Sequence, residues 1–410
     1  MEHQQSVVPH FGRIISALFL VAGTCIGGGM LALPVATGMN GFLPSLTVMF
    51  ICWAAMTASA LLLLEVSMWM EEGVHLITMA SRILGVPGKV ISWILYLFIC
   101  YASLVAYTAG GGMQIAAVAN NYFGFSLSNE LGAVIFILLF GGLFYLGNEI
   151  IGRVNTMLFG AMVLAYVILI GIGIPEINPE LLFYRQWSGT WMAISLMLTT
   201  FSFQTMVPSL TPYLKANARA LRISVIGGTL LTFLIYAIWL VLVLGIVPVE
   251  GEKGLTAAFV AGEPATQFLR EHVQGEWVYV VAEYFAFFAI VTSFFGIGFG
   301  LYDFLADGLK IKKQGIGQVI LGLLLVVPTL ICATYFERIF LVALETTGGF
   351  GDTVLNGLIP VAMVWMGRYH LGLSQSDSFR LGGGKPVLII VFVFFLVAFL
   401  LAVASQFGII

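Results

Sequence analysis

Long apolar runs separated by short polar loops cover almost the whole chain. The longest loops lie at 70–88, 175–189, 248–275 and 367–385, and in the first of them the apolar residues 76, 79, 80 and 83 fit either a helix on the membrane surface or an ordered loop. Apolar runs of about 20 residues are long enough to cross a bilayer as helices. The pattern predicts eleven such helices, at 13–38, 42–69, 89–119, 131–147, 154–174, 190–213, 222–247, 276–307, 316–333, 339–366 and 386–408.

Glycines interrupt the first apolar run. Gly23, Gly27, Gly28 and Gly29 lie within V-A-G-T-C-I-G-G-G-M-L-A-L-P, which ends at Pro34. Each glycine costs roughly 1 kcal/mol relative to alanine in a helix interior. Unwound backbone in a membrane is tolerated only where protein buries it or where it lines a polar cavity. The stretch is therefore either a helix broken for a ligand or a helix whose small residues let a neighbour approach closely.

A second interruption lies five helices further along, in L-T-T-F-S-F-Q-T-M-V-P-S-L-T-P, where Pro208 and Pro212 follow a polar stretch. The prolines alone are enough to kink a helix. Two interrupted helices at corresponding positions of inverted halves, however, mark the substrate site of a transporter. On this interpretation the halves span 13–174 and 190–366, the helix at 386–408 lies outside the repeat, and residues 1–12 form an N-terminal tail.

The composition agrees with an all-α polytopic membrane protein. The 410 residues are 60% hydrophobic and only 9% charged, whereas roughly 25% are charged in a soluble domain. The net charge of −3 does not suggest a nucleic-acid partner. The four cysteines fall within apolar runs without metal-ligand spacing, and the first ten residues lack the basic start of a cleavable signal peptide, so none is expected.

Lysine and arginine placement predicts the orientation. With the N-terminus inside, only Arg185, Lys253, Arg270 and Arg338 of the 17 basic residues fall outside. Basic residues accumulate on the cytoplasmic side of membrane proteins. An odd number of helices then places the C-terminus outside.

Four stretches together resemble one family of transporters. They are G-T-C-I-G-G-G-M-L-A-L-P in helix 1, L-L-L-L-E-V in helix 2, F-S-F-Q-T-M-V-P-S-L in helix 6 and V-T-S-F-F-G-I-G-F-G-L-Y-D-F-L-A-D-G-L in helix 8. They are similar to those of the bacterial tyrosine and tryptophan permeases, in the hydroxy and aromatic amino acid permease family. The resemblance spans essentially the whole chain and implies a LeuT-like fold with a five-plus-five inverted repeat, broken helices 1 and 6, and an extra C-terminal helix. Tyrosine permeases usually carry His where this chain has Gln204.

An amino-acid zwitterion needs hydrogen-bond donors for its carboxylate and acceptors for its ammonium group, and a broken helix supplies both from its backbone. Amides at Gly27 to Gly29, aided by the positive end of a helix dipole, would face the carboxylate. Aromatic side chains would contact the substrate ring or simply pack, and Gln204 would bind a phenolic hydroxyl or indole N–H or satisfy a neighbouring helix. The predicted substrate-binding residues are Gly23, Thr24, Gly27, Gly28, Gly29, Phe201, Ser202, Phe203, Gln204, Tyr101 and Tyr107.

Two sets of residues are candidates for the coupling ion. In the LeuT-like fold that the resemblance implies, sodium lies between the helix 1 break and helix 8, and ligation by oxygen atoms alone suits such a hard cation. The matching positions are Gly23, Ile26, Ala289, Thr292 and Ser293.

The tyrosine and tryptophan permeases are regarded instead as proton symporters, and acidic residues within membrane spans are usually functional. Each candidate also has a structural interpretation: Glu65 would pair with a basic residue, and Asp303 or Asp307 would form an inner gate with Arg13. The candidates for proton carriage or gating are Glu65, Glu283, Asp303, Asp307, Glu345 and Asp352.

The sequence thus predicts a proton-coupled symporter of the bacterial inner membrane that imports an aromatic amino acid, tyrosine first and tryptophan next. Sodium coupling is the alternative, and a channel or membrane sensor is the alternative of a different class. No ring of filter residues, H-E-x-x-H, G-x-S-x-G or P-loop occurs, so a channel, an enzyme and nucleotide-driven transport are disfavoured. Neither a cofactor nor a metal beyond the possible sodium is expected, and no obligate protein partner is evident.

Overall fold

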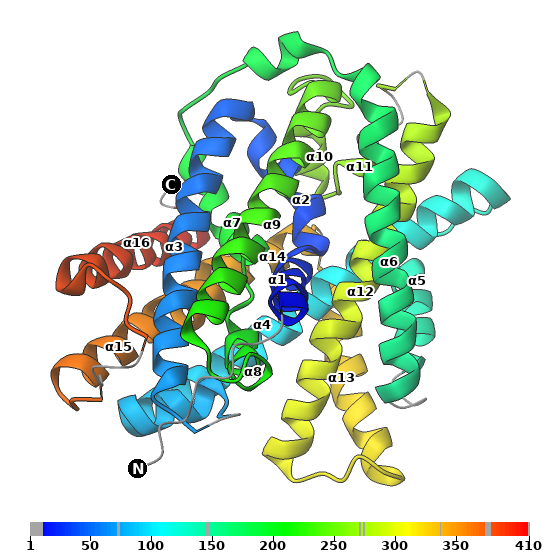
Figure 1. Ribbon diagram of the computed structural model, residues 1–410. Helices are drawn as coiled ribbons and strands as arrows, with labels where there is room; N and C mark the ends of the chain where they lie inside the picture. The colour runs from blue at the N-terminus through cyan, green and yellow to red at the C-terminus, as the bar shows by residue number, and fades with distance from the viewer. Residues whose placement is uncertain are drawn as a thin grey trace.

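The computed structural model describes residues 11–71, 74–143, 148–269, 272–273, 275–336, 338–373 and 379–408, so most of the predicted N-terminal tail lies outside the described part. The described residues form helices and loops without a strand (Figure 1). The α-helices are α1 (Phe11–Cys25), α2 (Gly28–Gly38), α3 (Phe42–Met68), α4 (Leu76–Phe123), α5 (Asn129–Phe136), α6 (Asn148–Gly173), α7 (Ile194–Thr200), α8 (Val207–Tyr213), α9 (Ala218–Ile246), α10 (Leu255–Ala261), α11 (Thr266–Leu269), α12 (Glu276–Leu309), α13 (Ile316–Tyr335), α14 (Ile339–Thr346), α15 (Ile359–Tyr369) and α16 (Gly384–Gln406).

Shorter helical segments join several of these helices. Two are π-helices, η1 (Ile137–Gly141) and η7 (Thr347–Leu358), the second of which lies between α14 and α15. The others are 3₁₀ turns, η3 (Ile174–Glu176), η4 (Pro179–Phe183), η5 (Thr190–Ala193) and η6 (Gln204–Met206).

The described residues contain nine helices long and apolar enough to span a membrane, and the bent pair of α1 and α2 makes a tenth. The predicted helix at 131–147 corresponds to a shorter apolar segment over Asn129–Gly141, and residues 144–147 lie outside the described part. The number eleven is therefore not confirmed. The other predicted helices agree with the structure to within a few residues, except that α4 begins well before residue 89.

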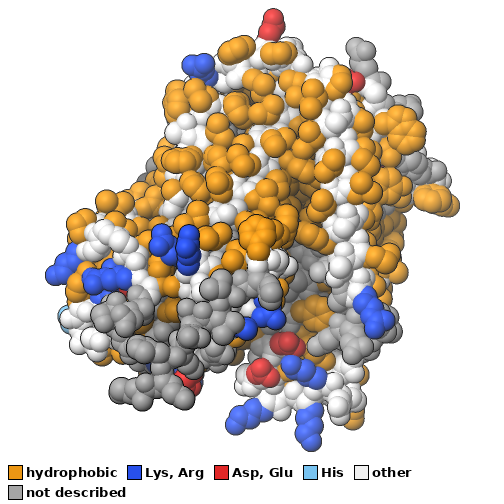
Figure 2. All heavy atoms as spheres, viewed as in Figure 1, with side chains coloured by type: hydrophobic (Ala, Val, Ile, Leu, Met, Phe, Trp, Pro, Cys, Tyr) orange, Lys and Arg blue, Asp and Glu red, His pale blue; other side chains and the backbone are white. Residues whose placement is uncertain are grey.

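The surface has the polarity of a membrane protein. In Figure 2, hydrophobic side chains cover the middle of the visible face, and lysine and arginine gather mainly towards its lower edge. Large apolar side chains such as Phe50, Val167 and Leu400 are about half exposed or more. Such exposure is unfavourable in water but suits a surface that lipid surrounds.

The segment at 70–88 is helical from Leu76 onwards. Gly85 adopts φ +71°, a conformation that disfavours side chains, and bends α4 there. The four apolar residues in the part of α4 before this bend, Leu76, Met79, Ala80 and Ile83, are buried within the protein. Of the two alternatives for this segment, a helix is the one seen, and its apolar residues pack on the rest of the chain.

Candidate substrate site at two helix breaks

The first break separates α1 from α2, which are bent by 55° relative to each other. Gly27 is extended there, with φ −164° and ψ −153°. A Cβ on Gly27 would lie 2.1 Å from Ser293 Oγ, and one on Gly28 would lie 2.5 Å from Tyr107 Cε1. Both positions therefore require glycine because side chains of α12 and α4 approach the backbone closely. The structure thus brings together three of the predicted substrate-site residues, Gly27, Gly28 and Tyr107, and one predicted sodium ligand, Ser293.

The second break separates α7 from η6 and α8, with Phe201, Ser202 and Phe203 in between. Gln204 is fully buried and holds this loop in place. Its Oε1 accepts a hydrogen bond from the Phe203 amide at 3.0 Å, and its Nε2 donates to the Met56 carbonyl of α3 at 3.1 Å. Of the two interpretations of Gln204, satisfying the protein's own backbone is the one seen here.

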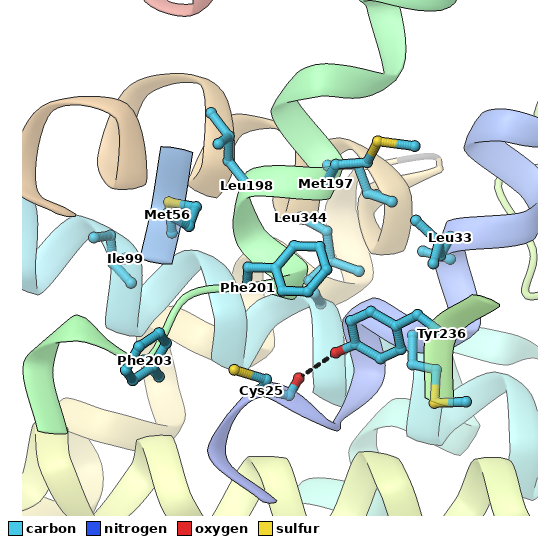
Figure 3. Close-up of a cluster of buried hydrophobic side chains, with 14 of the residues drawn as sticks. Cys25, Leu33, Met56, Ile99, Met197, Leu198, Phe201, Phe203, Tyr236 and Leu344 are labelled. Atoms are coloured by element: carbon cyan, nitrogen blue, oxygen red, sulfur yellow. Dashed lines mark hydrogen bonds between the residues drawn. The ribbon is translucent and has the colours of Figure 1, made fainter. Parts of the chain in front are cut away.

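One side chain that the sequence did not single out joins the two breaks. Tyr236 of α9 is fully buried, and its hydroxyl lies 2.7 Å from the Cys25 carbonyl and 2.9 Å from the Thr200 carbonyl. Figure 3 shows the hydroxyl directed at Cys25, with the ring of Phe201 beside that of Tyr236. Cys25 is the last residue of α1 and Thr200 is the last residue of α7. The C-terminal ends of these two half-helices therefore meet at the Tyr236 hydroxyl.

The predicted aromatic residues divide into two groups. Phe201 and Phe203 are fully buried at the second break, and the Phe201 ring meets that of Tyr236 edge to face at 5.3 Å. Tyr107 lies at the first break. Tyr101 does not, because its hydroxyl donates to the Leu324 carbonyl of α13 at 2.8 Å. Tyr101 therefore links two helices and does not line the site.

Thr24 and Gly23 lie on α1, the N-terminal half-helix, rather than between the breaks. Thr24 is exposed, and its hydroxyl lies 2.8 Å from the Leu20 carbonyl and 3.0 Å from Met206 Sδ. A Cβ on Gly23 would lie 3.0 Å from the Phe159 ring of α6, so this glycine provides a close approach between helices. Packing thus accounts for Gly23, as the alternative for this stretch anticipated.

A buried polar cluster fixes the second break to η7. Asp352 is fully buried, and its Oδ1 accepts hydrogen bonds from the Ser202 hydroxyl and from Asn356 Nδ2, each at 2.6 Å. Ser59 of α3 donates to the Asn356 carbonyl. Among the described residues Asp352 Oδ2 has no hydrogen-bond partner, since the nearby Thr199 hydroxyl donates to the Leu344 carbonyl at 2.8 Å.

The predicted sodium ligands on α12 are only partly directed at the first break. The Thr292 hydroxyl donates within its own helix, to the Phe288 carbonyl at 2.8 Å and less closely to that of Ala289 at 3.2 Å. Ser293 lies against Gly27. Ile26 lies in the break itself, and its amide donates to the Ala22 carbonyl at 3.0 Å.

Glu65 and Glu283 lie in settings of their own. The Glu65 carboxylate is bound to Arg368 at 2.5 Å, with both side chains almost fully buried, and it also accepts the Leu381 amide at 2.9 Å. Its predicted structural role, pairing with a basic residue, is the one observed. Glu283 is buried beside Tyr279, whose hydroxyl accepts a hydrogen bond from Asn121 at 3.0 Å.

The predicted inner gate between Arg13 and Asp303 or Asp307 is not formed. Asp303 pairs with Lys313 at 2.8 Å, in the turn that follows the same helix. Arg13 and Asp307 are exposed. The reason is the course of α1, which packs mainly along α9 and not along the end of α12 that carries Asp303 and Asp307. The last candidate, Glu345, is half-buried near the charge of Arg338.

The two halves of the first broken helix are buried to different extents. Every residue of α2 is buried, and α10 packs against its C-terminal end, where Leu255 lies next to Gly38. In contrast, Phe11, Phe19 and Leu20 of α1 are exposed. Of the two half-helices, α2 is therefore the more deeply buried.

A family model for the tryptophan/tyrosine permease family matches residues 12–402. The chain belongs to this family. The permease is 30% identical over 391 residues to the tyrosine-specific transport system 1 of Haemophilus influenzae, covering 93% of this chain and 94% of that protein. It is 26% identical over 387 residues to the tryptophan-specific transport protein of Pseudomonas aeruginosa, with 93% and 92% covered.

Solved structures share the fold of the permease. MhsT in complex with L-phenylalanine superposes with a TM-score of 0.63 at 14% identity, covering 97% of this chain and 98% of that one. A manganese transporter of Eremococcus coleocola gives 0.66 at 11% identity, with 98% and 89% covered. These likenesses establish the LeuT-like transporter fold. The protein is therefore a multi-pass membrane permease and not an enzyme.

Proposed function

We propose that the permease is a proton-coupled symporter that imports an aromatic amino acid, tyrosine first and tryptophan next, by alternating access around the two breaks. The names of its relatives, which are tyrosine- and tryptophan-specific transport proteins, support the substrate class. The observation that carries the proposal is the meeting of the two breaks at the centre of the fold, next to the buried carboxyl of Asp352.

The polarity of the half-helices suits a zwitterion. The first amides of α2, at Gly28 and Gly29, have no carbonyl partner within that helix. They stand at the positive end of its dipole, where a carboxylate is stabilised. Cys25 and Thr200 end α1 and α7, so their carbonyls stand at negative ends, which favour an ammonium group. The aromatic ring of the substrate then replaces contacts that Phe201 and Tyr107 make in this structure.

Coupling to a proton is supported by the surroundings of Asp352. The carboxyl is fully buried and has no ion-pair partner among the described residues. An isolated buried charge is costly, so the neutral carboxyl is accommodated more easily than the carboxylate. Since Ser202 connects Asp352 to the second break, a change in its protonation alters the hydrogen bonding of that break.

Sodium coupling is the second candidate, favoured by Ser293 next to the first break. The Thr292 hydroxyl retains lone pairs while it donates within α12, so it remains able to ligate a cation. The hydrogen bonds of the described residues do not connect Thr292 or Ser293 to the second break in the way that Ser202 connects Asp352 to it, which disfavours sodium.

The orientation completes the proposal. We place the N-terminus in the cytoplasm and the C-terminus in the periplasm of a bacterial inner membrane, following the basic residues. In this orientation the more deeply buried half-helix α2 faces outwards.

Uptake into proteoliposomes tests the substrate class. Labelled tyrosine should accumulate, and unlabelled tryptophan or phenylalanine should compete whereas serine and leucine should not. Strong competition by serine or leucine without any by tryptophan would exclude an aromatic substrate.

Ion replacement tests the coupling. An imposed inward proton gradient in sodium-free buffer should drive tyrosine uptake. If uptake instead requires sodium at fixed pH and falls in Thr292→Ala and Ser293→Ala, the coupling ion is sodium.

A further inference from the structure

Tyr236 connects three helices at one point. Its ring comes from the middle of α9, and its hydroxyl lies within hydrogen-bonding distance of the last carbonyls of α1 and α7. The residue is fully buried, and Trp239, one turn further along α9, donates to the Met30 carbonyl of α2 at 2.9 Å. This face of α9 therefore contacts the backbone on both sides of the first break.

The two carbonyls share a single proton. A tyrosine hydroxyl has one hydrogen to donate, so at 2.7 Å from Cys25 O and 2.9 Å from Thr200 O it cannot satisfy both fully at once. Each carbonyl oxygen also has a second lone pair. A buried carbonyl oxygen without a full hydrogen bond is costly. Here the two carbonyl oxygens lie at the negative ends of two helices.

We propose that Tyr236 is a positioning residue for the substrate ammonium group: its hydroxyl holds the Cys25 and Thr200 carbonyls at one point, where an ammonium group takes up the lone pairs that the hydroxyl leaves. This inference rests on the proposed function and adds the recognition of the ammonium end. An ammonium carries three donors, so it can bind both carbonyls while the hydroxyl remains bound to one.

The recognition is local to the two helix ends. The Tyr236 ring packs edge to face against Phe201, so the same residue positions both the Phe201 ring and the two carbonyls. Substrates that lack the ammonium group gain nothing from the carbonyl pair. The proposal therefore predicts that Tyr236 controls the preference for amino acids over the corresponding deaminated acids.

The test compares Tyr236→Phe with Tyr101→Phe in proteoliposomes. Tyr101 of α4 is a matched control because its hydroxyl also donates to a backbone carbonyl, that of Leu324 at 2.8 Å, but does not line the site. The measurements are the KM and maximal rate of labelled tyrosine uptake, the competition by 3-(4-hydroxyphenyl)propionate, and the melting temperature in detergent.

Tyr236→Phe should raise KM about tenfold, which corresponds to about 1.4 kcal/mol of lost binding free energy. It should also narrow the preference for tyrosine over the deaminated acid by a similar factor, and Tyr101→Phe should change neither KM nor this preference. A Tyr236→Phe protein with unchanged KM and preference, whatever its melting temperature, would overturn the inference. If wild-type protein takes up no tyrosine, the proposed function fails instead, so the two failures are distinguishable.

Should Tyr236→Phe fail to fold, Tyr236→His decides the question because it keeps a ring and an N–H donor. Retention of most of the preference for tyrosine over the deaminated acid supports the proposal. The proposal is contradicted if folded Tyr236→His prefers tyrosine over 3-(4-hydroxyphenyl)propionate no more strongly than Tyr236→Ala does.

Discussion

The Ser202 hydroxyl donates a hydrogen bond of 2.6 Å to Oδ1 of Asp352. The bond joins the unwound segment between α7 and η6 to the π-helix η7, and the Asp352 carboxyl is fully buried. A change in the charge of the carboxyl therefore acts directly on the backbone that is proposed to bind the substrate. Asp352 lies in a π-helix, a form that is rare and often found at functional sites.

Asp352→Asn should separate transport from coupling. The amide is close in shape to a protonated carboxyl but cannot release a proton. Uptake driven by a proton gradient should fall to background, while exchange of labelled for unlabelled tyrosine should persist.

Glu283→Gln is the matched control, because Glu283 is also a buried acid but lies beside Tyr279 and not at a break. It should retain gradient-driven uptake. Gradient-driven uptake by Asp352→Asn at the wild-type level would rule Asp352 out as the proton carrier.

Gly28→Ala should block transport through a steric clash. The new methyl group would lie 2.5 Å from Tyr107 Cε1, so the buried ring or the α2 backbone must shift. We expect the ratio of maximal rate to KM to fall by about tenfold or more. Gly160→Ala on α6, where no atom lies within 4 Å of the added Cβ, should leave uptake unchanged. Equal activity of the two variants would contradict the close approach.

The breaks themselves could be predicted from sequence, since glycine and proline disfavour continuous helix wherever they occur. The partners of those breaks could not. Tyr236 lies in an apolar helix without any interruption, and its hydrogen-bond partners are backbone carbonyls of two other helices, which leave no residue-type signal. Tyr101 and Tyr107 are equivalent in the sequence pattern, and only the packing of α4 separates the tyrosine at Gly28 from the one at Leu324.

The gate illustrates a second limit. Arg13 and Asp303 lie at the expected ends of their helices, but pairing between them depends on which helix α1 packs against, and α1 packs mainly along α9. Lys313 is nearer in sequence and reaches Asp303 from the following turn. Charge patterns thus indicate which groups are available, while helix packing decides which of them meet.

The buried pair of Glu65 and Arg368 should behave as a structural ion pair. Arg368→Met alone leaves the Glu65 charge buried without its partner, which costs about 3–5 kcal/mol. Replacing both residues, with Glu65→Leu added, should recover much of that loss because no isolated charge remains. Thermal unfolding in detergent measures both effects. A single variant as stable as wild type would show that the pair is not needed.

Glu263, in the loop between α10 and α11, should give a dependence of stability on pH. Burial raises the pKa of its carboxyl above the ordinary value of 4.5. The folded state then binds more protons than the unfolded state above that value, so this group's contribution to stability is lost as pH rises through the folded pKa. Glu263→Gln should therefore raise the melting temperature near neutral pH and leave it unchanged at about pH 4. Glu252→Gln, at an exposed site in the loop between α9 and α10, should have no effect at either pH.

The central claim is that a proton moves inward with the amino acid through the region of Asp352. The most direct measurement is the external pH of a lightly buffered, sodium-free suspension of proteoliposomes when tyrosine is added. The account predicts an immediate rise in external pH for wild-type protein and none for Asp352→Asn. No rise for wild-type protein, together with sodium uptake when tyrosine and sodium are supplied, would contradict it.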